Sequence, residues 1–144
     1  MAETPPSDAP SGELLTGLSP VVDASARVLV LGSMPGVRSL DQARYYAHPR
    51  NAFWPIVGEL VGVAPQDDYG RRLAALRAAG IALWDVIGQC RRPGSLDRRI
   101  EAGSIVVNDL PGLIRDCPDL ALIAFNGSRA EQEFRRRVAP GLHG

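Results

Sequence analysis

The stretch from Arg27 to Ile56 reads RVLVLGSMPGVRSLDQARYYAHPRNAFWPI and joins an apolar segment to a long polar loop. Residues 27–31 are mostly valine and leucine, which is typical of a strand covered on both faces of a parallel sheet. The following loop is rich in Gly, Ser, Pro, Tyr, His and Asn, so it offers tight turns and exposed backbone N–H groups to a polar ligand. We therefore predict a binding loop at the carboxyl end of a buried strand.

Strand and helix signals alternate along the rest of the chain. Strands are predicted at 81–86 and 120–125, and helices at 52–60 after an Asn51 N-cap, at 68–79 before Gly80, between an Asn108 N-cap and Pro118, and where Ala130, Phe134 and Val138 share one face. A polar loop is predicted at 88–94, followed by a short helical turn that Ser95 caps and that ends at Ile100. This alternation predicts an α/β fold, a three-layer α/β/α sandwich around a short parallel sheet.

The carboxyl ends of the three predicted strands indicate where a ligand would bind. In open parallel sheets, ligands bind in the crevice outside these ends. Here the loops at these ends are 32–51, 87–95 and 126–128. We expect the three loops to converge on one site.

Length and composition favour one domain. The chain has 144 residues with 45% apolar content, which suffices for a single core. Residues 1–19 lack a basic segment followed by an apolar one, so we interpret them as a disordered leader rather than a secretory signal, and residues 20–144 as the domain. No apolar stretch reaches membrane-spanning length. We expect a cytoplasmic monomer with no membrane partner.

The sequence gives no pattern for a metal or a cofactor. Cys90 and Cys117 are isolated, and His48 and His143 have no chelating spacing with them. The segment 32–36 has neither Rossmann nor Walker spacing, and no lysine follows it. A hydrolase triad is poorly supported too, because no nucleophile elbow surrounds the serine of that segment. We expect no cofactor and no metal.

The positive charge is carried entirely by arginine and is concentrated on the predicted site loops. The chain has sixteen Lys and Arg residues, all of them Arg, and no net charge. Segments 24–58 and 86–100 each contain four arginines against one aspartate. Solvated arginines on exposed loops would explain either cluster alone. Two clusters on candidate site loops favour a polyanionic partner, since arginine forks match phosphate geometry.

Aromatic, imidazole and amide side chains gather just before the predicted helix at 52–60. This composition suits an extruded nucleobase, which proteins hold by stacking and by hydrogen bonds to its edges. We interpret Phe53 and Trp54 as core residues of the helix. Tyr46, His48 and Asn51 remain the site candidates.

The string GSMPGVRSLDQARYYAHPRNAFWPI resembles the opening motif of the hypoxanthine-DNA glycosylase branch of the uracil-DNA glycosylase superfamily. The shared features are Gly-Ser-x-Pro, Ser-Leu, Tyr-Tyr and His-Pro-x-Asn-x-Phe-Trp. Later segments that are similar to the family are 82–87, 95–97, 108–110 and 125–127, so the resemblance spans roughly 18–138. It implies removal of a deaminated base, hypoxanthine or uracil, from double- or single-stranded DNA by hydrolysis of the N-glycosidic bond.

The resemblance also implies roles for individual residues. Asn51 would position the attacking water, Tyr46 would stack on the extruded base, and Asn126 with backbone groups around Ser33 would contact the base edges. The candidate substrate-binding residues are Gly32, Ser33, Met34, Pro35, Ser39, Tyr46, His48 and Asn126, and the candidate DNA-binding residues are Arg38, Arg50, Arg91, Arg92 and Ser95. Because the chain has no lysine to form a Schiff base, we expect base removal without strand cleavage.

One family motif is not found in this chain. The resemblance implies a fourth strand and a Leu-Pro-Ser-Thr-Ser-Pro-like loop, which contributes to DNA grip and pocket closure, whereas this sequence ends PGLHG. The domain at 20–144 is therefore expected to be C-terminally incomplete. The alternative to a glycosylase is a catalytically silent α/β domain that binds nucleic acid.

Overall fold

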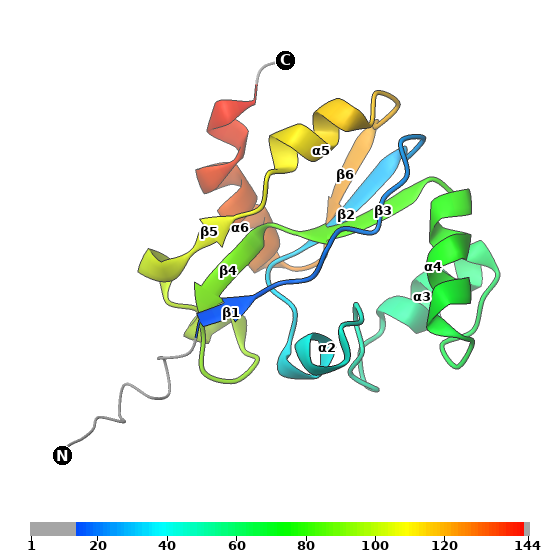
Figure 1. Ribbon diagram of the computed structural model, residues 1–144, viewed down its shortest axis with the longest axis horizontal. Helices are drawn as coiled ribbons and strands as arrows, with labels where there is room; N and C mark the ends of the chain where they lie inside the picture. Colours follow the sequence, from blue (N-terminus) through cyan, green and yellow to red (C-terminus); the bar gives the residue numbers. More distant parts are fainter. Residues whose placement is uncertain (1–13, 143–144) are drawn as a thin grey trace.

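The computed structural model describes residues 14–142, and its centre is a parallel sheet of three strands (Figure 1). β2 (Val28–Gly32) lies in the middle and pairs in parallel with β3 (Ile81–Asp85) on one side and β6 (Leu122–Phe125) on the other. The predicted strands at 27–31, 81–86 and 120–125 are thereby confirmed to within two residues at either end. All three carboxyl ends lie at the same edge of the sheet.

Helices cover both faces of this sheet, as the alternating pattern predicted (Figure 1). Leu29 and Leu31 of β2 are fully buried in one apolar cluster with residues of α5 and α6. Val30, between them in β2, packs against the other cluster, which contains Leu83 and residues of α3 and α4. Because side chains alternate along a strand, β2 contributes to the core on both faces. The three-layer α/β/α sandwich is confirmed.

The helix boundaries follow local capping chemistry, with two corrections to the predicted caps. The Asp68 side chain accepts a hydrogen bond from the Arg71 N–H at the start of α4. Asp109, not Asn108, caps α5, where its side chain accepts from the Gly112 N–H at 3.0 Å. Ala52, not Asn51, occupies the N-cap of α3. At α5 the prediction was one residue early because Asn108 and Asp109 are adjacent polar residues, and at α3 the Asn51 side chain still accepts from the Phe53 N–H although it lies one residue before the N-cap.

A second sheet, which the sequence analysis missed, lies beside the first. It is antiparallel in the order β1-β4-β5. β1 (Leu14–Thr16) falls within the predicted disordered leader and β4 (Ile87–Arg91) overlaps the predicted polar loop, so both expectations are wrong there; residues 1–13 lie outside the described residues. The pairing places Leu15 opposite the buried Cys90. Burial of apolar residues between distant segments, rather than local pattern, therefore creates these strands.

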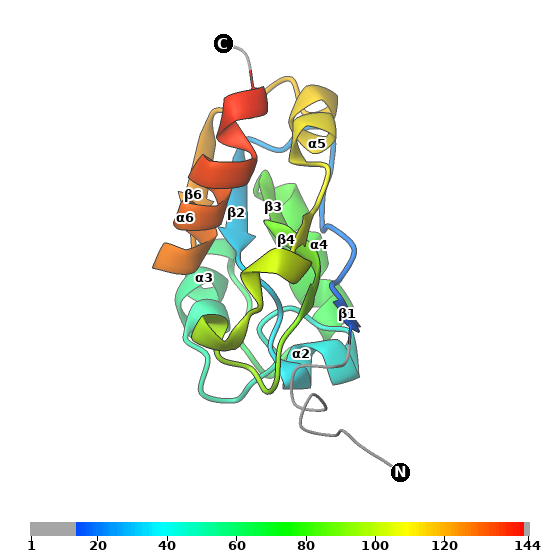
Figure 2. The ribbon, with the colours of Figure 1, turned by 90° about the vertical axis from the view of Figure 1, so that its left-hand side faces the viewer.

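The loop after β2 contains a short helix that lies beyond the carboxyl end of that strand (Figure 2). The remaining bounds are α2 (Val37–Gln42), α3 (Phe53–Val61), α4 (Tyr69–Ala78), η2 (Asp97–Arg99), η3 (Ala102–Ser104), β5 (Val106–Val107), α5 (Leu110–Asp116), α6 (Ser128–Arg137) and η4 (Ala139–Gly141).

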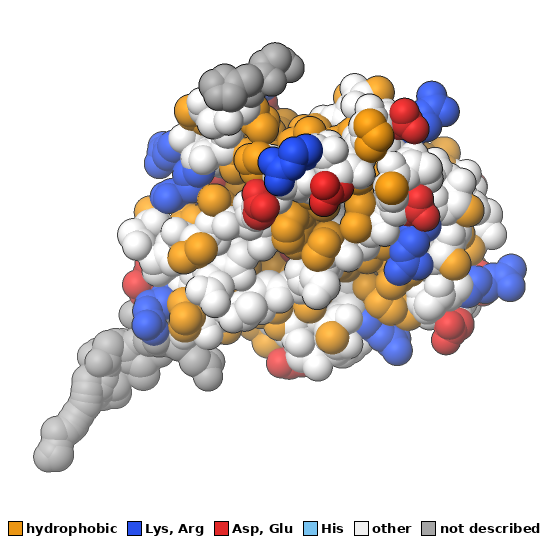
Figure 3. Space-filling model, turned by 45° about the horizontal axis from the view of Figure 1, so that its top comes forward, with side chains coloured by type: hydrophobic (Ala, Val, Ile, Leu, Met, Phe, Trp, Pro, Cys, Tyr) orange, Lys and Arg blue, Asp and Glu red, His pale blue; other side chains and the backbone are white. Residues whose placement is uncertain are grey.

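The surface around α5 and the C-terminal end of the chain carries mixed charge (Figure 3). Basic and acidic side chains alternate over this face, with apolar side chains between them, instead of forming one positive surface. In the part of the chain that the structure describes, no helix has the length and apolar character needed to cross a membrane.

Candidate active site

A cavity of about 370 Å³ opens where the three parallel strands end. The loops at 32–39 and 45–51, together with 95–97, form its walls. Asp85 and Asn126 contribute from the ends of β3 and β6. The predicted convergence of the loops on one site is confirmed, and the size suits a small ligand such as a nucleobase.

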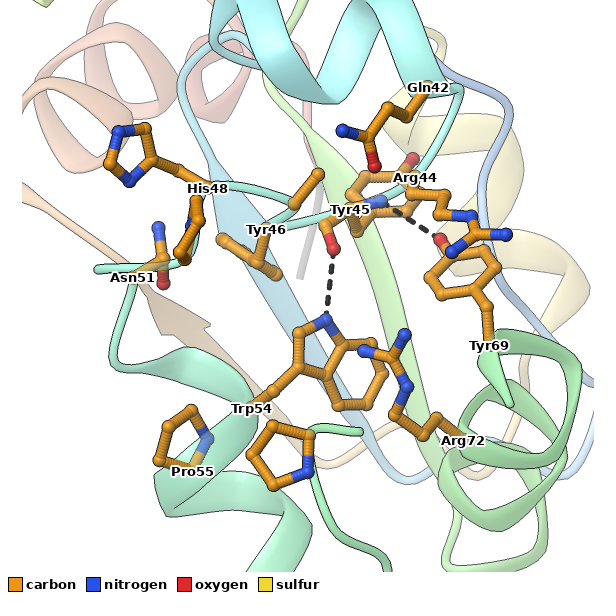
Figure 4. Close-up of a pocket in the computed structure, with 13 residues that line it drawn as sticks. Gln42, Arg44, Tyr45, Tyr46, His48, Asn51, Trp54, Pro55, Tyr69 and Arg72 are labelled. Carbon is orange, nitrogen blue, oxygen red and sulfur yellow. Dashed lines mark hydrogen bonds between the residues drawn. The ribbon is translucent and has the colours of Figure 1, made fainter. Parts of the chain in front are cut away.

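The loop that carries Asn51 is anchored by an aromatic cluster beneath it (Figure 4). The Trp54 Nε1–H donates to the Tyr45 carbonyl oxygen at 2.9 Å, and the Tyr45 N–H donates to the Tyr69 hydroxyl at 2.9 Å. The Arg72 guanidinium lies 4.6 Å from the centroid of the Trp54 ring. Trp54 is buried, which confirms its interpretation as a core residue. These contacts hold the loop in one position.

His48 and Asn51 lie close together on this anchored loop (Figure 4), and both line the cavity. The Asn51 Oδ1 accepts a hydrogen bond from the Phe53 N–H at 2.9 Å, so the orientation of the carboxamide is fixed by the start of α3. His48 Nδ1 accepts from the Arg50 N–H at 3.0 Å, which leaves Nε2 as the protonated nitrogen of the neutral ring. Because Asn51 makes its own contact through Oδ1, its NH₂ group stays available for another partner.

Tyr46 forms an aromatic wall of the cavity. Its backbone adopts the left-handed region with φ of 56°, and its ring stacks on Phe53 with centroids 4.0 Å apart and an interplanar angle of 18°. A base could therefore stack only on the opposite face of the Tyr46 ring. The hydroxyl is buried without a partner in hydrogen-bonding geometry, and burial, which the neighbouring Asn126 side chain offsets only in part, raises the pKa of Tyr46 to about 12.

Several predicted site residues lie at the cavity but use their side chains within the fold. The Ser33 hydroxyl donates to Asp97 Oδ1 at 2.8 Å. The Ser39 hydroxyl accepts from the Ala47 N–H at 3.0 Å. Met34 packs in a buried cluster away from the parallel sheet's main core. These side chains shape the site, and Gly32, Pro35 and Asn126 also line it.

The predicted DNA-binding residues separate into exposed and structural ones. Arg38 and Arg50 are exposed, and Arg91 is half-buried. Arg92 contradicts the prediction, because it is only 3% exposed and its guanidinium donates to the carbonyls of Gly94 at 2.6 Å and Pro35 at 2.9 Å. It joins the two site loops instead of reaching phosphate.

Ser95 also has a different role from the predicted one. Leu96, not Ser95, occupies the N-cap of the short η2 turn. The Ser95 hydroxyl instead accepts a hydrogen bond from the Val37 N–H at 2.8 Å, at the start of α2. The side chain thus fastens the loop after β4 to the loop after β2, a contact between segments far apart in sequence.

Sequence reasoning missed several residues that line the cavity, and the most consequential is Asp85. It is 5% exposed and lines the cavity from the end of β3, and its Oδ2 atom has no hydrogen-bond partner. Burial, and next the negative charge of Asp97, raise the pKa of Asp85 to about 7. An acidic residue that directly ends an apolar strand was the available sequence signal.

The cysteines and histidines do not gather at this site. Cys90 and Cys117 are both buried and unpaired. His48 lies at the cavity, and His143 lies outside the described residues. Between residues 14 and 142, no three side chains of His, Cys, Asp or Glu lie close enough together to hold a metal ion.

Comparison with known proteins assigns the family of this fold and site. The family model of the Uracil DNA glycosylase superfamily matches residues 19–143. The chain belongs to this superfamily. The match covers most of the chain and confirms the resemblance carried by the segment after β2.

Similar proteins occur in two species of Methanosarcina. A hypoxanthine DNA glycosylase of Methanosarcina acetivorans is 40% identical over 115 residues, which cover 79% of this chain and 72% of the relative. One from Methanosarcina barkeri is 38% identical with the same coverage. A solution NMR structure of a Methanosarcina acetivorans protein with a provisional uracil DNA glycosylase assignment superposes with a TM-score of 0.72 at 37% identity, covering 86% of this chain and 78% of that one.

Proposed function

We propose that this member of the superfamily is a monofunctional DNA glycosylase that hydrolyses the N-glycosidic bond of a deaminated base. The observation that carries the proposal is the oriented Asn51 carboxamide at the wall of a base-sized cavity. The relatives named hypoxanthine DNA glycosylase support hypoxanthine as the first substrate to test, with uracil as the second.

The chemistry requires little beyond positioning. An extruded nucleotide would place its base in the cavity against the free face of Tyr46 and its sugar near Asn51. The Asn51 amide would hold the water that attacks the anomeric carbon as an oxocarbenium-like transition state forms. Hydrogen bonds at the base edges, including from Asn126, would stabilise the departing base. The water's oxygen joins the sugar, and the base leaves with the bonding electrons and gains a proton.

Phosphate contacts would come from the exposed arginines. Arg38 lines the cavity, and Arg50 lines an adjoining groove of about 610 Å³ between α3 and β6. Guanidinium groups at these places can neutralise backbone phosphates on either side of an extruded nucleotide, in double- or single-stranded DNA. Arg91, half-buried on β4, is a third candidate.

The absence of lysine supports a reaction that stops at base removal. Glycosylases that also cut the strand use an amine to form a Schiff base with the sugar. The sequence contains no lysine, so its one amine is at the N-terminus. The product would be an intact strand with an abasic site.

Single-turnover assays on matched oligonucleotides test this function. Duplexes and single strands should carry hypoxanthine, uracil or adenine at one position, and release should be measured before and after hot alkali. We expect base release from hypoxanthine, none from adenine, strand cleavage only after alkali, and no protein–DNA adduct on borohydride treatment. Binding of the hypoxanthine duplex without base release would instead support the catalytically silent alternative, and a borohydride-trapped adduct would exclude the monofunctional reaction.

A further inference from the structure

Asp85 is the buried polar group of the cavity that the reaction above does not use. It is the last residue of β3 and lies opposite Gly32 in the register of β2. Its Oδ2 atom is buried without a hydrogen-bond partner among the described residues. A buried polar atom without a partner destabilises the fold, so such an atom at a cavity wall indicates a group that can pair with a ligand.

The surrounding backbone is shaped to accept this carboxyl group. A Cβ atom at Gly32 would lie only 2.5 Å from Asp85 Oδ1, so a larger residue there would displace the carboxyl. The Asn108 side-chain amide donates to the Asp85 main-chain oxygen at 2.8 Å, and the Val86 N–H donates to the Gly32 carbonyl at 2.9 Å. Both strand ends are thereby fixed around the acid.

The groups that face Asp85 are acidic or neutral. Asp97 of η2 and the phenols of Tyr45 and Tyr46 are the ionisable groups that interact with it. No salt bridge to Asp85 occurs between residues 14 and 142. Burial is therefore not offset, and the raised pKa of about 7 keeps the carboxyl protonated up to neutral pH.

A second unsatisfied group borders the same spot. The Tyr46 hydroxyl, also buried without a partner, would lie 3.6 Å from a Cβ atom on Gly32. Two unsatisfied polar groups therefore border one end of the cavity, at Gly32. An apolar ligand would leave both unsatisfied, so this end of the cavity suits a ligand edge that carries hydrogen-bond donors and acceptors.

We propose that Asp85 is a specificity-determining residue that, as a neutral acid, donates a hydrogen bond to the carbonyl oxygen of a deaminated base and accepts one from the adjacent ring N–H. This inference rests on the proposed glycosylase function. Hypoxanthine presents N1–H beside O6, and uracil presents N3–H beside O4, so both offer the same pair of groups. An ionised Asp85 would place only acceptor oxygens against that carbonyl and would repel it.

The pH profile of base release tests this role, with Asp85→Asn as the main variant. Asparagine offers a donor and an acceptor at every pH, whereas the acid loses its donor on ionisation. We expect the wild-type single-turnover rate on a hypoxanthine duplex to fall about tenfold per pH unit above about pH 7, where the neutral acid becomes scarce. The Asp85→Asn rate should stay within about threefold from pH 6 to 9. Thermal unfolding of the variant checks that it folds.

His48→Gln is the matched control, because His48 is the imidazole that lines the same cavity. It should keep the wild-type decline with pH. A decline that persists in Asp85→Asn, or that disappears in His48→Gln, would overturn the role of Asp85, as would a flat wild-type profile. If Asp85→Asn does not fold, the wild-type and His48→Gln profiles decide the question.

Failure of the glycosylase function would appear differently, as no base release by the wild type at any pH. Binding then still tests Asp85. The Asn51→Ala variant should prefer a hypoxanthine duplex to the matched adenine duplex below pH 7 and lose this preference at pH 9, and adding Asp85→Asn should abolish the pH dependence. A preference that is absent or unchanged with pH would overturn the proposal.

Discussion

Glu133 and Asp85 are two buried carboxyl groups with opposite surroundings. Glu133 on α6 is 4% exposed, and its two oxygens accept hydrogen bonds from Arg129 Nε at 2.7 Å and Arg137 Nε at 2.6 Å. Asp85 is 5% exposed, has no cationic partner among the described residues and leaves Oδ2 unsatisfied. The difference separates a carboxylate that builds the fold from an acid that the fold holds for a ligand.

The two groups give opposite dependences of stability on pH. Burial alone would raise the pKa of Glu133, but hydrogen bonds from Arg137 and Arg129 outweigh it and lower that pKa. Its contribution to stability is therefore present above the unfolded-state pKa and is lost as the pH falls through the folded-state value. Asp85 has a raised pKa, so the native state binds its proton more tightly than the unfolded state does, and stability falls as the pH rises from about 4 to about 7.

The paired carboxylate also supports the cavity. Arg129 donates through Nη1 to the Asp97 carbonyl at 2.7 Å, and Arg137 donates through Nη2 to the Ala102 carbonyl at 3.2 Å. Glu133 thereby links α6 to the segment that carries Asp97, a cavity residue. The hydrogen-bonded network around Glu133 therefore holds in place the cavity wall that carries Asp97.

The largest loss of stability on substitution is expected from breaking the satisfied side. Glu133→Ala removes the partner of two arginines and should lower the free energy of unfolding by about 3 kcal/mol. Glu131→Ala is the matched control on the same helix, since its pair with Arg135 is exposed, and it should change stability by less than about 0.5 kcal/mol. Urea unfolding measures both. If both variants lost the same free energy of unfolding, burial of the Glu133 network would add nothing to stability.

On the cavity side, Asn51→Ala should affect chemistry far more than stability. Water-positioning contacts act mainly in the transition state, so single-turnover base release should fall on the order of 100-fold while affinity for the damaged duplex changes little. Rates at saturating enzyme and binding isotherms separate the two effects. If binding, rate and melting temperature all fell in parallel, the role of Asn51 would be limited to the structural contact with the Phe53 N–H.

Asp85→Asn should remove the falling limb of the stability profile. Between about pH 4 and pH 7 the wild type should lose up to about 1.4 kcal/mol per pH unit relative to this variant, and the difference should level off above the folded pKa of about 7. Urea unfolding at several pH values gives the difference directly. If the difference in free energy of unfolding between wild type and variant stayed constant over this pH range, Asp85 would not be a protonated acid in the native state.

Tyr46 tests whether the cavity wall acts through its ring. Tyr46→Ala should weaken binding of the damaged duplex by about 1 to 3 kcal/mol, because a stacking surface is lost, whereas Tyr46→Phe keeps the stack on Phe53 and should be mild. Fluorescence anisotropy with abasic and hypoxanthine duplexes measures both variants. Similar losses in both would assign the effect to the buried hydroxyl.

The smallest effect should come from the exposed arginines. Arg50→Gln should weaken DNA binding similarly for all sequences and reduce the slope of log affinity against log salt by about 1, because one phosphate contact is lost. Arg92→Gln should leave that slope unchanged and instead lower thermal stability, since its guanidinium bonds the Pro35 and Gly94 carbonyls. Salt titrations of both variants distinguish the two roles.

The amino-acid sequence by itself determined the parallel sheet, the flanking helices and the loop that carries the site. The apolar pattern from Arg27 to Leu31 predicts a buried strand, and the spacing of Ala130 and Phe134 predicts the buried face of α6. Both follow from the sequence because the residue periods of strands and helices are local properties. The Gly, Pro and Asn content of the following loop likewise places the site at the end of β2. These features depend on neighbours within a few residues.

Tertiary structure alone decided the second sheet and the state of the buried polar groups. β1 becomes a strand because it pairs with β4, a segment far away in sequence, with Thr16 opposite Gln89. Arg92 and Asp85 are both charged residue types next to site loops, yet the Arg92 guanidinium donates to two main-chain carbonyls inside the fold, whereas Asp85 is left with an unsatisfied oxygen. Burial and hydrogen-bond partners depend on which distant segments cover a residue, and no local pattern encodes that.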